Sequence, residues 1–163
     1  MPFIDRILIV SLMIFSFSSL SGDSSEMTGA SLESIIREVA VEDVNVNGNI
    51  IEFAFQGVSL VCIYDQTHNR MRIISPIVDY AEITNEQKDR MMQSNFHSAL
   101  DARYASSGGV LYSAYIHPLA SLSREDVLSA IYQVASLSLS FGKEYSSGIL
   151  TFGEEAPDPE ELI

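Results

Sequence analysis

The sequence predicts an α+β domain in which an antiparallel five-stranded sheet carries helices on one face, in the order αβββαββα. Apolar residues alternate in short segments joined by turn sequences such as Ser107-Gly108-Gly109, which indicates hairpins. Three other segments repeat apolar residues at helical spacing. The chain has 163 residues, of which 47% are hydrophobic and 19% charged, and this size and composition fit one globular domain.

The first half of the chain predicts one helix and three strands. A short amphipathic helix follows Ser31, the expected N-cap, and its apolar residues are Leu32, Ile35, Ile36 and Val39. Alternating apolar residues predict strands at 50–56, 58–64 and 70–78. Pro76 has no backbone N–H to donate within a sheet, so it predicts either an edge position or a bulge in the third strand.

The second half predicts a helix, a hairpin and a final helix. Thr84 and Gln87 have the spacing of a capping box, which predicts the start of a helix over residues 85–100. Strands follow at 102–106 and 110–117. Ser123 is the expected N-cap of the last helix, and Glu125 and Asp126 lie in its first turn, where the helix dipole favours acidic side chains.

The last helix carries two apolar stripes, although packing on a sheet covers only one. The first stripe is Val127, Ile131, Val134, Leu137 and Phe141, and the second is Leu128, Tyr132, Ala135 and Leu139. The second stripe therefore needs another cover, which is either the first helix of the same chain or a partner. If a partner covers the second stripe, the chain binds either another protein or a second copy of itself in a homodimer.

The two ends of the sequence predict segments outside the fold. Residues 7–20 form an uncharged apolar run behind Arg6, which is typical of a signal peptide that is cleaved after residue 21. This predicts an exported protein, periplasmic or secreted, with no membrane span after cleavage; an uncleaved N-terminal anchor is the alternative. A linker at 22–30 would precede a domain at 31–152, and residues 153–163 read as an acidic tail.

Charge and residue spacing exclude several functions. The chain has 9 basic and 22 acidic residues, and its net charge of −13 repels nucleic acid. The histidines are too far apart in sequence for one turn or helix to present two metal ligands; they are His68, His97 and His117. Cys62, the single cysteine, lies in an apolar strand, where a thiolate is disfavoured. We therefore expect no catalytic residues, no metal and no cofactor.

Several short sequence elements resemble the YbjN family over roughly residues 31–152. They are Asn95-Phe96, Ala102-Arg103-Tyr104, Ile116-His117-Pro118-Leu119 and Leu122-Ser123. That family is described as bacterial sensory transduction regulators, and its fold is similar to that of type III secretion chaperones, small acidic dimers that bind extended segments of other proteins. The resemblance implies a chaperone-like fold and supplies no catalytic residues.

Together these observations predict a non-enzymatic exported module that binds protein, either as a chaperone or as a regulator. The expected contact surface is the second stripe of the last helix. The alternative is a sensor of small ligands, with an apolar pocket between the second helix and the sheet. Met92, Phe96 and Tyr104 would line that pocket.

Overall fold

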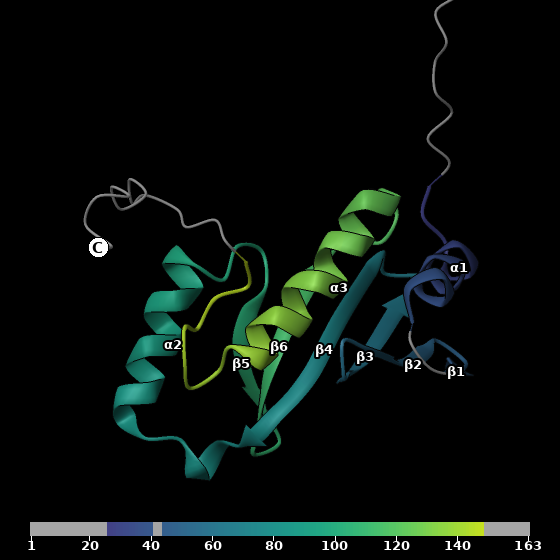
Figure 1. Cartoon of the computed structure of the whole chain (residues 1–163). Helices are drawn as coiled ribbons and strands as arrows, with labels where there is room; N and C mark the ends of the chain where they lie inside the picture. The colour runs from purple at the N-terminus through teal and green to yellow at the C-terminus, as the bar shows by residue number, and fades with distance from the viewer. Residues whose placement is uncertain (1–25, 41–43, 149–163) are drawn as a thin grey trace, which may run out of the picture.

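The computed structural model describes residues 26–40 and 44–148, which form one sheet and its helices (Figure 1). The elements are α1 (Gly29–Val39), β1 (Asn45–Asn47), β2 (Ile50–Phe55), β3 (Val58–Asp65), β4 (Arg70–Asp79), the 3₁₀ turn η1 (Tyr80–Glu82), α2 (Asn85–His97), β5 (Arg103–Ser107), β6 (Val110–His117) and α3 (Arg124–Leu139). The predicted signal segment, residues 1–21, and the predicted tail, 153–163, lie outside the described residues. The α+β class and the antiparallel sheet are confirmed.

The sheet has six strands in the order β1-β2-β3-β4-β6-β5, one more than the sequence predicts. The additional strand is β1, which forms a tight hairpin with β2. Gly48 turns the chain between them with a φ of 62°, a conformation that glycine adopts without strain. The Asn45 side chain donates a hydrogen bond of 2.9 Å to Glu52 across the pair.

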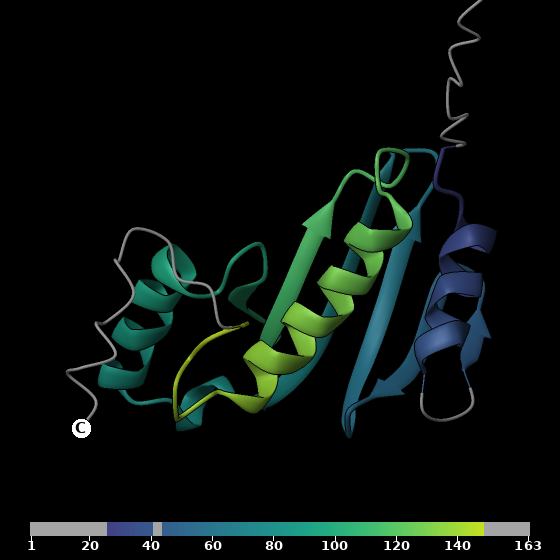
Figure 2. The ribbon, with the colours of Figure 1, turned by 45° about the horizontal axis from the view of Figure 1, so that its top comes forward.

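The helices lie on one face of the sheet and at one of its ends (Figure 2). α3 packs across β3, β4, β5 and β6, and α1 packs beside it over β2. α2 instead contacts β5. Side chains from α1, α3 and the covered sheet face form one core, whose largest fully buried members include Leu32, Ile36, Ile51, Ile73, Ile131 and Leu137.

The helix caps agree with the sequence for α2 and α3 and differ for α1. Thr84 and Ser123 form the N-caps of α2 and α3, each within a capping box. The N-cap of α1 is Thr28, not Ser31, because Thr28 Oγ1 accepts a hydrogen bond of 3.2 Å from the backbone N–H of Ser31. α1 therefore includes Gly29 and Ala30 of the predicted linker.

The predicted bounds of the second helix also need correction, because α2 ends at His97. Its C-cap residue is Ser98, and Leu100 has a left-handed φ of 55°, which ends the helical path before the predicted residue. Pro76 lies in β4 beyond Ile74, the last residue that pairs with β3, and it pairs only with Tyr112 of β6. The register shifts between Pro76 and Val78, so Pro76 lies both at a bulge and at a locally unpaired edge, as the two interpretations of the sequence allow.

Residues 140–148, after α3, fasten α2 to the rest of the domain. The Ser94 and Ser98 hydroxyls of α2 and its C-cap both donate to the carbonyl of Tyr145, at 2.5 and 2.9 Å. The Tyr145 ring packs edge-on against Tyr104 of β5 and Phe141, with ring centroids 6.1 and 5.6 Å apart. Within residues 26–40 and 44–148, no helix is both long and apolar enough to cross a membrane.

Candidate protein-binding surfaces

The second stripe of α3 is exposed at two of its four positions. Tyr132 is 48% exposed and Leu139 is 51% exposed, whereas Leu128 is half-buried against the core. Ala135 has no exposed surface, so the prediction that it contacts a partner needs correction. The helix turns Ala135 toward neighbouring elements, and its single methyl group is too short to reach solvent. The accessible stripe is therefore Tyr132 with Leu139.

α1 packs beside α3 (Figure 2), which is one of the two arrangements that the sequence predicts for the second stripe. An ion pair of 2.5 Å joins Arg124, at the start of α3, to Glu38, near the end of α1. Both side chains are about half exposed, so this pair contributes little to stability and mainly marks where the two helices meet. Tyr132 and Leu139 stay exposed despite this contact.

A shallow hollow of about 360 Å³ adjoins the exposed part of the stripe. Tyr132, Ser136 and Leu139 of α3 line one side of it, and Glu144, Ser146 and Gly148 line the other. An apolar ring and a leucine beside small polar groups form a surface that an apolar side chain of another protein can fill. α3 and residues 140–148 thus provide one continuous candidate contact surface.

The predicted ligand pocket between α2 and the sheet does not form as expected. Tyr104 is buried, and its hydroxyl donates a hydrogen bond of 2.8 Å to the Leu137 carbonyl of α3. Phe96 is 77% exposed and does not line the hollow that contains Met92 and Tyr104. That hollow measures about 150 Å³, below the roughly 300–1,000 Å³ of typical small-molecule sites. Met92 and Phe96 instead present an apolar pair to solvent.

Cys62 is fully buried in β3, between Ile51 of β2 and Ile73 of β4. Burial raises the pKa of its thiol to about 12, because the thiolate would lose its solvation. A thiol with this pKa is protonated at neutral pH and is a poor nucleophile. Cys62 therefore acts as a small apolar core residue.

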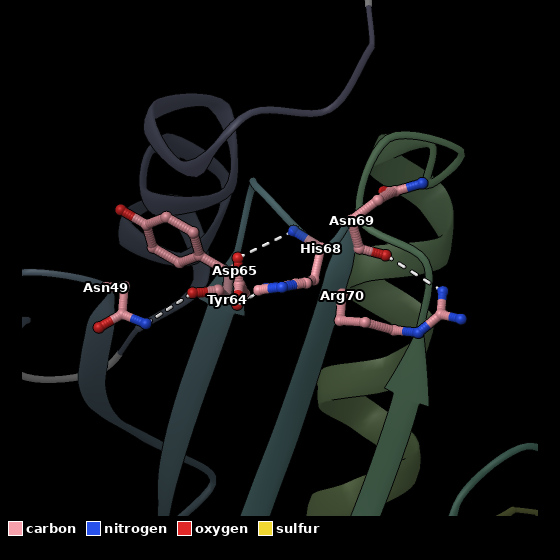
Figure 3. Close-up of polar contacts among 6 residues, drawn as sticks. All are labelled: Asn49, Tyr64, Asp65, His68, Asn69 and Arg70. Carbon is pink, nitrogen blue, oxygen red and sulfur yellow. Dashed lines mark hydrogen bonds and ion pairs between the residues drawn. The ribbon is translucent and has the colours of Figure 1, made fainter.

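His68 belongs to a polar turn between β3 and β4 (Figure 3). Its ring lies 2.7 Å from the Asp65 carboxylate, and its backbone N–H donates to the same side chain at 3.0 Å. This backbone hydrogen bond is the main reason why the pKa of Asp65 is lowered. Asn69 links this turn to the segment between β6 and α3, because its side chain accepts a hydrogen bond of 2.7 Å from the Ala120 N–H. The cluster thus stabilises a turn.

The other histidines lie elsewhere in the fold. His97 ends α2, and His117 ends β6 with its Nδ1 2.8 Å from the Pro118 carbonyl oxygen. The part of the chain that the structure describes contains no group of three His, Cys, Asp or Glu side chains placed to hold a metal ion.

A chain in the structure of the HopA1–SchA chaperone–effector complex is similar in fold to this chain. The TM-score is 0.53 at 10% identity, over 68% of this chain and 88% of the other. A chain in the structure of the Yersinia pestis type III secretion chaperone SycH with a fragment of YscM2 gives 0.52 at 12% identity, over 70% and 99%. The fold is that of type III secretion chaperones.

A third structure with the chaperone fold is the ExsC–ExsE complex. It matches with a TM-score of 0.53 and 10% identity, over 77% of this chain and 95% of the other. No protein-family model and no curated protein sequence matches this chain. The chaperone-like fold predicted from the sequence is therefore confirmed by structure alone, and the resemblance to the YbjN family stays a prediction.

Proposed function

We propose that the chain is an exported, non-enzymatic module that binds another protein through Tyr132 and Leu139 of α3. One observation carries the proposal: a fold shared with chaperones solved in complex with other proteins presents these two large apolar side chains to solvent. Each of those three structures is of a complex between two proteins. The buried, protonated thiol of Cys62 supports the non-enzymatic part of the proposal.

The chemistry of the surface favours a protein rather than a small molecule as the ligand. Tyrosine side chains are enriched among interface residues whose truncation weakens binding, because they bury a large apolar area and keep one polar group for a hydrogen bond. Leu139 lies two helical turns from Tyr132, on the same side of α3. The hollow of about 360 Å³ beside them is open enough to receive a side chain of the partner.

Photocrosslinking at these positions tests the proposal. Tyr132 and Leu139 are each replaced by p-benzoylphenylalanine in the full chain, which is expressed in its native host and irradiated. We expect one defined crosslinked protein, either a partner or a second copy of the chain, and its loss in the Leu139→Asp variant when the crosslinker is at Tyr132. Asp89, an exposed polar position of α2, is the matched control. Equal crosslinking from Asp89, or none from Tyr132 and Leu139, would refute the proposed surface.

Export is a separate part of the proposal and needs its own test. It rests on the uncharged apolar run at residues 7–20 behind Arg6. We expect residues 1–30 to direct a fused alkaline phosphatase, which is active only after export, across the bacterial inner membrane. Ile9→Asp with Ile14→Asp interrupts the apolar run and should abolish the activity. Phosphatase activity that survives both substitutions would contradict an export signal.

A further inference from the structure

The last described residue of the chain, Gly148, forms part of the wall of the hollow beside the exposed stripe of α3. Tyr132 and Leu139 belong to the same wall from the side of the helix. In Figure 1 residues 140–148, drawn in yellow, run from the end of α3 toward α2. The segment that follows residue 148 therefore begins at the edge of the apolar surface that we propose as a binding site.

Hydrogen bonds fix the position from which this next segment starts. The Ser146 hydroxyl donates to the Gly148 carbonyl at 2.5 Å and accepts from the Gly148 N–H at 3.3 Å. Ser147 is fully buried, its N–H donates to the Ser98 carbonyl at 3.1 Å, and its hydroxyl donates to the Ala99 carbonyl at 2.5 Å. The domain thus holds residue 148 beside the hollow, and chain length alone keeps the next few residues near it.

The next four residues have the composition and the length to cover the exposed stripe. Residues 149–152 are Ile-Leu-Thr-Phe, three of them large and apolar and none of them charged. Four extended residues span at most about 13–14 Å. Tyr132 and Leu139 are seven residues apart in α3, or about 10 Å along the helix axis. One short extended segment that starts at Gly148 can therefore contact both side chains.

We infer that residues 149–152 occupy the hollow and cover Tyr132 and Leu139 until a partner displaces them. This inference rests on the proposed function and deepens it, because it names a control on the same surface. A short tether gives the segment an effective concentration on the order of mM, so a partner or a second copy at about 1 μM has to compete with it. Glu144, which also lines the hollow, favours these uncharged residues over the acidic ones at 153–163.

Disulfide trapping in the full chain tests this inference. Leu139→Cys combined with Phe152→Cys places one thiol on each side of the inferred contact, and the buried Cys62 stays unreactive. We expect oxidised glutathione to form an intramolecular disulfide. The matched control also carries Ile149→Ser and Leu150→Ser, which keep the tether and remove apolar contact, so its disulfide should form at least about tenfold more slowly. Circular dichroism verifies the fold of each variant.

Two outcomes of the trapping would overturn the inference. Equal rates in the two proteins would show that the tether alone brings the thiols together, without apolar packing. Disulfides that form only between two chains, seen as dimers on a non-reducing gel, would assign the hollow to a second copy.

The photocrosslinker at Tyr132 separates this inference from the proposed function. If the segment covers the surface, Ile149→Ser with Leu150→Ser should raise the yield of crosslinked partner about threefold or more. An unchanged yield would leave the proposed surface standing and contradict its cover by residues 149–152. A fast intramolecular disulfide without any crosslinked partner would support the cover and refute the proposed function.

Discussion

Replacing Gln133 by leucine tests the energetic basis of the junction between α2 and β5. Gln133 of α3 is 5% exposed, and its Oε1 accepts hydrogen bonds from the backbone N–H groups of Asp101 and Ala102, at 2.9 and 3.1 Å. Its Nε2 donates to Ser129 Oγ at 3.0 Å. One side chain of α3 thus satisfies two consecutive backbone donors of the segment that leads into β5.

Gln133→Leu conserves the approximate volume and removes the acceptor. The Ala102 N–H belongs to a fully buried residue, and its loss of a partner costs about 1–3 kcal/mol. Asp101 is exposed, so water can replace much of its bond, and about 1 kcal/mol is lost there. We expect the free energy of unfolding to fall by about 2–4 kcal/mol, which lowers the urea midpoint by about 1–2 M at a typical slope of about 2 kcal/mol/M.

Urea titrations followed by circular dichroism measure this difference. Gln93→Leu is the matched control, because it makes the same chemical change at an exposed position of α2. Its free energy of unfolding should stay within about 0.5 kcal/mol of the wild-type value. If Gln133→Leu unfolded at the wild-type urea concentration with an unchanged slope, the two backbone donors would not depend on this side chain, and the reasoning would be wrong.

Three further predictions concern other residues. Burial raises the pKa of Cys62 from 9.0 to about 12, so the stability that its neutral thiol contributes is complete below pH 9 and declines as the pH rises toward 12. Urea titrations at several pH values should therefore show a smaller loss of stability with rising pH in Cys62→Ala than in the wild type. Tyr132→Asp should change the thermal midpoint by less than about 2 °C, whereas Ala135→Asp places a charge in the core and should prevent cooperative unfolding in calorimetry. The hydrogen bond from the His68 backbone N–H is the main reason why the pKa of Asp65 lies below 3.8. His68→Ala keeps that N–H, so an NMR titration of this variant should still show a lowered pKa for Asp65, and a return to 3.8 would assign the shift to the imidazole.

The sequence predicted those elements that have a strong local signal. Thr84 and Gln87 have the spacing of a capping box, and alternating apolar residues mark the four longer strands that form the middle of the sheet. β1 has one apolar residue, Val46, between two asparagines, so its pairing with β2 has no signature in its own sequence. The cap of α1 was missed because Thr28 and Ser31 are both good N-caps, and only the burial of Met27 with Leu32 favours the earlier start.

The candidate surfaces were less predictable than the fold, because exposure depends on how elements assemble. Helical spacing correctly placed Tyr132 and Leu139 on an outer stripe, but it assigned Ala135 to the same stripe although packing buries it. The α2 pocket failed because Phe96 turns outward while Tyr104 is held by the Leu137 carbonyl. Periodicity identifies the two faces of a strand but not which of them the helices cover.

The amide of Asn95 in α2 occupies the outer edge of β5. Its Oδ1 accepts from the Tyr104 N–H at 2.8 Å, and its Nδ2 donates to the Tyr104 carbonyl at 3.2 Å. Both backbone groups that Tyr104 would offer to a neighbouring strand are therefore already paired. End-to-end stacking of sheets into a filament requires two free edges on every molecule, and here Asn95 protects one of them. Asn95→Ala would unmask that edge, and fibril formation followed by thioflavin fluorescence would report the loss of this protection.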